Sequence, residues 1–148
     1  MTQLGLKSIY NTTLQEEWAS GIDTYLGATV RGYPNMFHIY GPHAPTLFSN
    51  GPAAIEVQGR FVGDMIGKLE RQGVKYFNPT AEASQEWKKL VSHLSDITLF
   101  PHTRSTYMGG AVPGKKVEAM CFTGGLPLYR THIRAAYDSL DGFELVKA

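Results

Sequence analysis

The longest regular pattern in the sequence is an amphipathic helix that starts at Pro52 and ends before Gly73. Proline is favoured in the first turn of a helix, because its missing N–H would have no intrahelical partner there. Glycine readily takes the left-handed conformation that commonly ends a helix. Between these residues, apolar side chains recur at helical spacing, at Ile55, Val62, Met65, Ile66 and Leu69. The sequence therefore predicts a helix over 52–72.

The elements before this helix are shorter. Thr13 and Glu16 have the spacing of a capping box, which predicts a short helix through Trp18. The apolar run 36–40 predicts a short buried strand, and another short strand is expected within 24–35, before a turn rich in Gly, Pro and Asn.

Two further helices and one strand are expected in the second half of the chain. One helix starts at Thr80, with an apolar stripe of Trp87, Leu90, Val91, Leu94 and Ile97. The other runs over 128–139, with Ile133, Ala136 and Leu140 inward. The stretch GFELV, 142–146, is expected as a strand. The fold class is therefore mixed α/β, with fewer strands than a stand-alone domain of 148 residues usually shows.

Composition narrows the class of protein. A chain of 148 residues fits one domain, and 14 basic against 13 acidic side chains give no basic stripe for nucleic acid. Cys121 is the single cysteine, so an internal disulfide framework is impossible, and it is expected as a small buried apolar residue. No apolar run approaches the ~20 residues of a membrane span, and no signal-peptide pattern is present. These features predict a cytoplasmic protein.

The strongest local candidate for a ligand site is the stretch 35–56, a predicted strand, loop and helix start. Ligands of open α/β sheets bind beyond the carboxyl ends of strands, and a helix N-terminus offers free N–H groups and partial positive charge. Gly51, between Asn50 and Pro52, would let a ligand approach the backbone closely. An ordinary strand-to-helix turn explains the same residues, so the residues alone leave both interpretations open.

The remaining polar residues give no catalytic or metal signature. None of the five histidines has metal-ligand spacing with a carboxylate or cysteine. His38 is interpreted as a packed core histidine and His43 as a surface-loop residue. The sequence contains no nucleophile elbow, phosphate loop or G-x-G-x-x-G dinucleotide fingerprint. We therefore predict no catalytic residue and no metal site in this chain.

A glycine-rich run, STYMGGAVPGKK at 105–116, forms a long predicted loop. Long ordered loops are uncommon and often act as lids over a site. A flexible surface connection is the alternative, and the chemistry of the residues leaves it open.

Six blocks of sequence together resemble a known family. They are TYLGATVRGYPNMFHIYGPHAP, FSNGPAAIEVQG, EWKKLVSHLSDITLFP, YMGGAVPGK, GGLPLYR and the closing GFELV. In order and spacing, they resemble the C-terminal part of the Baeyer–Villiger monooxygenases, the flavin enzymes of the cyclohexanone and phenylacetone monooxygenase type. The resemblance implies an enzyme that uses FAD and NADPH to insert one oxygen atom next to a ketone, or to oxidise sulfur or nitrogen.

The resemblance also implies roles for three segments. The helix beginning at Asn50, Gly51 and Pro52 points its N-terminus at the pyrimidine edge of the flavin, where N–H groups stabilise negative charge. The loop before it faces the substrate, a small hydrophobic ketone, through Thr46, Leu47 and Phe48. The glycine-rich run is the control loop over NADP, with Thr106, Tyr107, Gly109, Gly110 and Ala111 as expected cofactor-binding residues.

The chain departs from the family pattern. By resemblance it is one unit, with a flavin-side strand, loop and helix over 1–72 and C-terminal helices with the control loop over 73–148. It has only part of the FAD-domain sheet, and both dinucleotide motifs of the family lie upstream of the matching blocks. Thr106 stands in place of a tryptophan and Ala111 in place of an asparagine, so an aromatic ring and an amide that touch NADP are lost.

Two functions follow from these observations. In the first, the chain is the C-terminal segment of a monooxygenase and is not catalytic alone, because it binds neither FAD nor NADP tightly. It would then expose apolar surface and associate with itself or with an FAD-carrying partner chain. In the second, it is a stand-alone, non-redox binding or interaction module derived from a monooxygenase tail.

Overall fold

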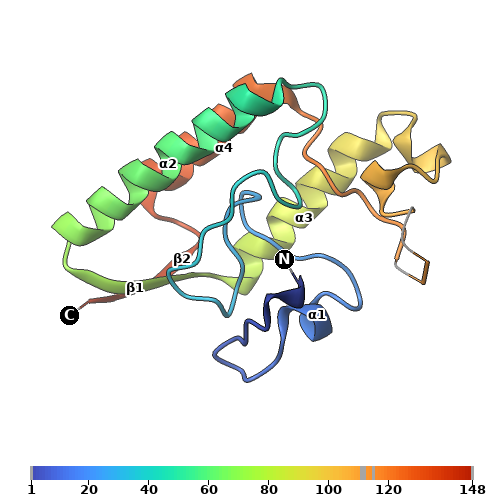
Figure 1. Ribbon diagram of the computed structural model, residues 1–148. Coiled ribbons are helices and arrows are strands. Elements are labelled where there is room, and N and C mark those ends of the chain that lie inside the picture. The colour runs from blue at the N-terminus through green and yellow to red at the C-terminus, as the bar shows by residue number, and fades with distance from the viewer. Residues whose placement is uncertain (1, 111–112, 115, 148) are drawn as a thin grey trace.

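The computed structural model describes residues 2–110, 113–114 and 116–147 and has the predicted mixed α/β class (Figure 1). The helices in this part of the chain are α1 (Leu14–Glu17), α2 (Gly51–Arg71), α3 (Ala81–Asp96) and α4 (Gly125–Ser139). Strands β1 (Val74–Pro79) and β2 (Phe143–Lys147) form an antiparallel two-stranded ribbon. Short 3-10 turns span Thr2–Leu4, Phe100–His102 and Thr106–Met108. Among the described residues, no helix is long and apolar enough to cross a bilayer.

Side-chain caps confirm the predicted starts of α1 and α3. Thr13 and Glu16 form the reciprocal capping box at α1. The Thr80 hydroxyl accepts a hydrogen bond from the Ala83 N–H at the start of α3, at 3.1 Å. Helix α4 begins before the predicted residue 128, because Pro127 fits its first turn.

The strand predictions were right only at β2. Strand β1 was not predicted, and no strand forms over 36–40 or within 24–35, where Tyr25 and Thr29 make one isolated bridge. The segment 36–40 has no neighbouring strand. Its backbone groups bond singly to different partners, such as the His38 N–H to the Ala28 carbonyl at 2.8 Å. A ladder needs consecutive partners on one neighbour, so the apolar run forms no strand and bends at its end.

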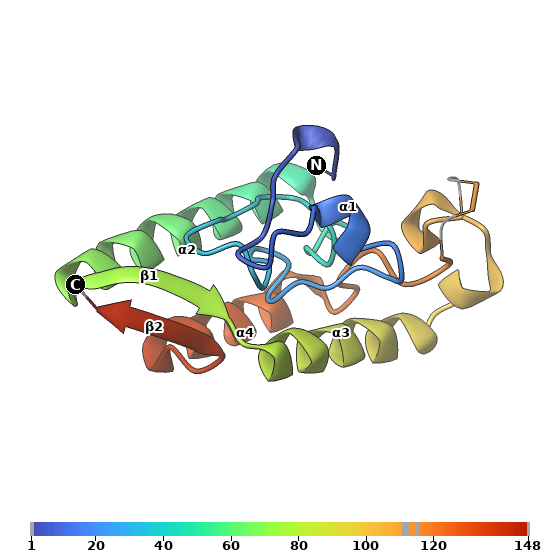
Figure 2. The same ribbon diagram turned by 90° about the horizontal axis from the view of Figure 1, so that it is seen from below.

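Residues 24–50 form an irregular segment, here called the strap, that runs between α2 and α3 (Figures 1 and 2). A continuous core joins the strap, the three long helices and the ribbon. The indole of Trp87 stacks on the ring of Phe122 with centroids 5.1 Å apart, and both lie near Tyr129. A second, smaller core joins the N-terminal residues to the strap through Leu14, Trp18, Ile22, Val30 and Tyr33.

The buried face of α2 differs from the predicted stripe. Ile55 and Ile66 are exposed, whereas the buried residues are Ala54, Val57, Gln58, Phe61, Met65 and Leu69. In α3, Trp87 and Val91 are buried as predicted, but Ile97 is exposed at the end of the helix. Ile133, Ala136 and Leu140 are buried as predicted.

Candidate functional site

The start of α2 is the geometric centre of the candidate site. The Asn50 side chain accepts a hydrogen bond from the Ala53 N–H at 3.2 Å, and its carbonyl accepts from the Ala54 N–H at 3.0 Å. Pro52 has no N–H to donate. Among the described residues, the Gly51 amide is therefore the first-turn N–H that lacks an intramolecular partner. One N–H and the partial positive charge of the helix fit a single carbonyl-type oxygen better than a phosphate, which takes several such donors.

Two backbone hydrogen bonds hold the loop before α2 in place. The His43 N–H donates to the Met120 carbonyl at 2.8 Å, and the Phe122 N–H donates to the Ala44 carbonyl at 3.0 Å. Gly27 lies directly against this loop, because a Cβ built on it would be 2.3 Å from the His43 carbonyl oxygen. Its φ of +56° also favours glycine. The predicted substrate-facing residues, Thr46, Leu47 and Phe48, thus stand on a firmly anchored loop.

His43 is buried, so its prediction as a surface-loop residue was wrong. The side chain is 1% exposed, and its Nδ1 lies 3.0 Å from the Thr24 hydroxyl. The imidazole also bonds the Ala119 backbone. Burial lowers the pKa of His43 to about 3 and that of the half-buried His38 to about 4. His43 is therefore a neutral cross-link between the two ends of the strap and the segment before α4.

Phe48 and Tyr107 are brought together through a third ring. The Phe48 and Phe100 centroids are 5.9 Å apart, and the Phe100 and Tyr107 centroids are also 5.9 Å apart. Phe48 is 70% exposed, so this aromatic row offers an apolar surface. Phe100 was not among the predicted site residues. Cys121, buried as predicted, lies beside Thr46, and its own burial raises the pKa of the thiol.

The glycine-rich run is anchored at both ends. The Glu118 N–H donates to the Met108 carbonyl and the Met120 N–H to the Tyr107 carbonyl, each at 3.0 Å. The Glu118 carboxylate accepts from the Ile22 N–H at 2.7 Å and lies 3.6 Å from the Lys88 ammonium. Thr106 is exposed, Gly109 is buried and Gly110 is packed against Arg104. The predicted contact at Ala111 lies outside the described residues.

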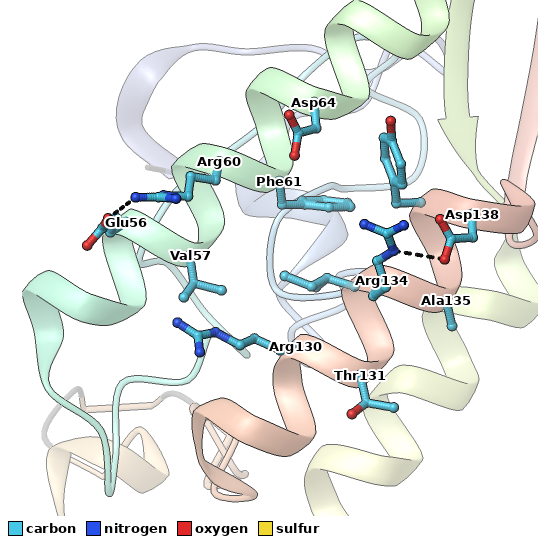
Figure 3. A pocket seen from close by; sticks show the side chains of 12 residues that line it. Glu56, Val57, Arg60, Phe61, Asp64, Arg130, Thr131, Arg134, Ala135 and Asp138 are labelled. Atoms are coloured by element: carbon cyan, nitrogen blue, oxygen red, sulfur yellow. Dashed lines mark hydrogen bonds and ion pairs between the residues drawn. The ribbon is translucent and has the colours of Figure 1, made fainter.

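A groove of about 930 Å³ lies elsewhere, between α2 and α4 (Figure 3). Its rim carries three arginines and three carboxylates: Arg60, Arg130, Arg134, Glu56, Asp64 and Asp138. Arg60 pairs with Glu56, and Arg134 with Asp138, along their own helices. The groove contains none of the predicted site residues, and its balanced charges select no ligand class.

Comparison with known proteins places the chain in a family. The FAD-binding monooxygenase acrE of Aspergillus aculeatus is 49% identical over 148 residues, which are 100% of this chain and 25% of that protein. The cyclopentanone 1,2-monooxygenase of Comamonas is 36% identical over 129 residues, 87% of this chain and 24% of that protein. The crystal structure of cyclohexanone monooxygenase from Rhodococcus bound to NADP+ superposes with a TM-score of 0.90 at 34% identity, over 96% of this chain and 27% of that one.

The comparisons also set the extent of the match. No family model matches the chain. The chain spans about a quarter of the length of these relatives. The matches nevertheless cover almost all of it, in sequence and in fold, and the relatives are flavin monooxygenases, one of them in complex with NADP+. Over the quarter of their length that it spans, the chain matches the C-terminal part of the Baeyer–Villiger-type flavin monooxygenases, as its sequence blocks predicted.

Proposed function

We propose that this chain is the part of a Baeyer–Villiger-type monooxygenase that sets a helix N-terminus against the flavin. The observation that carries the proposal is the start of α2, where Asn50 and Pro52 leave the Gly51 N–H as the free first-turn donor. FAD, when bound, supplies the oxygen-inserting chemistry. The Gly51 N–H and the positive end of α2 stabilise the negative charge that gathers on the pyrimidine edge of the reduced ring.

The loop before α2 faces the substrate in this proposal. Thr46, Leu47 and Phe48 precede the flavin-facing turn, and the aromatic row from Phe48 to Tyr107 adds apolar surface beside them. This apolar surface suits a small hydrophobic ketone, the class to which cyclopentanone belongs. No residue of this chain is assigned a catalytic role.

The glycine-rich run contacts NADP in this proposal. Its expected cofactor-binding residues are Thr106, Tyr107, Gly109, Gly110 and Ala111. The hydrogen bonds of Met108 and Glu118 hold the described residues near the two ends of this run.

The chain needs a flavin-carrying portion to act. It has no G-x-G-x-x-G motif, so alone it should bind FAD and NADP only weakly. We propose that residues 1–72 supply the flavin side and residues 73–148 the remaining helices and the control loop. The flavin-carrying portion would lie on the same chain or on a separate partner, and without it the exposed aromatic row would favour self-association.

A chimera tests the proposal. This chain replaces the matching quarter of the Comamonas cyclopentanone monooxygenase, and bound flavin and ketone-stimulated, NADPH-dependent oxygen uptake are measured. We expect a yellow protein with uptake that cyclopentanone stimulates. The matched variants are Gly51→Pro, which removes the proposed donor, and Gly51→Ala, which keeps it; both add a Cβ beside the Tyr40 hydroxyl, so Gly51→Pro should weaken FAD binding more than Gly51→Ala. A folded chimera that binds no flavin would refute the proposal.

A second candidate, the non-redox binding module, is favoured by one observation. The described residues close a continuous core of three helices, strap and ribbon by themselves. The chain alone should then be monomeric and unfold cooperatively. Light scattering and thermal unfolding of the purified chain separate the two candidates, because the monooxygenase segment should associate.

A further inference from the structure

A buried glutamine lies at the centre of a hydrogen-bond network in α2. Gln58 is 0% exposed, and its Nε2 donates to the Gly27 carbonyl and to the Tyr129 hydroxyl, each at 2.9 Å. Its Oε1 accepts from the Tyr40 N–H at 2.7 Å. The Tyr129 hydroxyl in turn donates to the Leu26 carbonyl at 2.7 Å.

Each donor and acceptor in this network has a defined partner. Both N–H donors of Gln58 and its carbonyl oxygen are used, and the Tyr129 hydroxyl accepts one bond and donates one. Burial and this hydroxyl geometry leave a single arrangement, and burial also raises the pKa of Tyr129. Because a shift of the strap would leave buried polar groups without partners, these hydrogen bonds favour one position of the strap on α2.

The network reaches the start of α2 through Tyr40. Tyr40 has a left-handed φ of 59°, an unfavourable conformation for tyrosine that the bond from its N–H to Gln58 helps to hold. Its hydroxyl covers the start of the helix, since a Cβ built on Gly51 would lie 2.8 Å from it. Gln58 therefore holds the backbone of Tyr40 in place, and the Tyr40 side chain lies beside the free Gly51 N–H.

We infer that Gln58 is a positioning residue, which acts through Tyr40 to orient the first turn of α2 and the loop before it. For its effect on the flavin, this inference rests on the proposed function. For the position of the strap it stands on the four hydrogen bonds alone. In the sequence, Gln58 stands out as a polar residue on the otherwise apolar buried face of α2.

Amide hydrogen exchange on the full chain tests the inference. Gln58→Met keeps side-chain length but removes the acceptor for the Tyr40 N–H. In Gln58→Met, we expect the exchange rate of the Tyr40 amide to rise about 100-fold more than that of the Val91 amide, which lies in the core. The matched control is Met65→Ala, which weakens the same helix without touching a hydrogen bond, and should speed exchange evenly. An even increase in Gln58→Met would overturn the inference.

A second variant keeps the test decisive if Gln58→Met does not fold. Tyr40→Phe keeps the backbone bond to Gln58 and removes only the hydroxyl over Gly51. Exchange at the hydrogen-bonded amides of Ala53 and Ala54 should rise about tenfold, with the Tyr40 amide unchanged. Unchanged exchange in the first turn would refute the link from Tyr40 to α2.

The flavin signature separates this inference from the proposed function. In the chimera, Gln58→Met should lower the flavin midpoint potential, because a displaced helix N-terminus stabilises the reduced ring less. Met65→Ala should leave the potential at the parent value. An unchanged potential in Gln58→Met would contradict a positioning role toward the flavin. If the chimera binds no flavin at all, the proposed function fails, while the exchange experiment still decides whether Gln58 positions the strap.

Discussion

The long helices and the strap achieve order by different means. In α2, α3 and α4, backbone groups find partners within the same helix, and side chains only choose which face is buried. In the strap, remote side chains and carbonyls hold the backbone, and non-glycine residues take left-handed φ values at Leu26, Asn35, Tyr40, His43 and Phe48. Local rules therefore govern the helices, whereas the strap depends on contacts that exist only in the folded chain.

The largest expected effect comes from adding one methyl group to the strap. Gly27→Ala places a Cβ 2.3 Å from the His43 carbonyl oxygen in a left-handed conformation. We expect a loss of about 3 kcal/mol in the free energy of unfolding. The same change in α2, Gly63→Ala, meets nothing within 4 Å and should stabilise the chain by up to about 1 kcal/mol. Denaturant unfolding of both variants measures the two free-energy changes. Equal changes would contradict the proposed difference between the strap and the helices.

A smaller effect follows from protonation of the strap histidines. The folded pKa values of His43 and His38 lie below the unfolded value near 6.5, so the unfolded chain binds more protons in acid. The contribution of each neutral histidine to the free energy of unfolding is complete above pH 6.5 and is lost as the pH falls toward the folded pKa values. Between pH 7 and pH 5, each histidine should lower the free energy of unfolding by about 2 kcal/mol. Urea unfolding of the parent and of His43→Gln should show a shallower acid slope in the variant, and identical slopes would contradict His43 burial.

The smallest effect compares two helix caps. Asn50→Ala removes the cap where the strap meets α2, and Thr80→Ala removes the cap where β1 meets α3. Each should lower the free energy of unfolding by about 1 kcal/mol. Thermal unfolding checks this. If Asn50→Ala proves neutral while Thr80→Ala does not, the strap rather than the cap fixes the start of α2.

The sequence predicted the helices well because their signals are local. Thr13, Pro52 and Thr80 indicate helix starts through contacts within their own first turns. Gly73, with φ +66°, follows the end of α2 as expected. The strands predicted within the strap were wrong, because an apolar run such as 36–40 indicates only that its side chains are buried. Whether such a run pairs as a strand depends on a neighbour that the sequence does not reveal.

The candidate site was predicted in part. Turn chemistry predicted the helix start at Asn50, Gly51 and Pro52, which the structure confirms. The flavin-facing role of that start, and the roles of Thr46 to Phe48 and of the glycine-rich run, come from the resemblance and are proposals. Burial of His43 and the link through Phe100 were not predictable, since both arise from segments far apart in the chain. Gln58 carried a usable signal, because it falls on the buried face of a long helix.

The ribbon has a consequence for how the chain is made. Strand β1 leaves the ribosome well before its partner β2, because α3, the glycine-rich run and α4 are synthesised between them. Until residues 143–147 have emerged, β1 is an open strand edge that can pair with another nascent chain. The later strand thus protects the earlier one, and synthesis of this part of the chain should depend on chaperones until β2 has emerged.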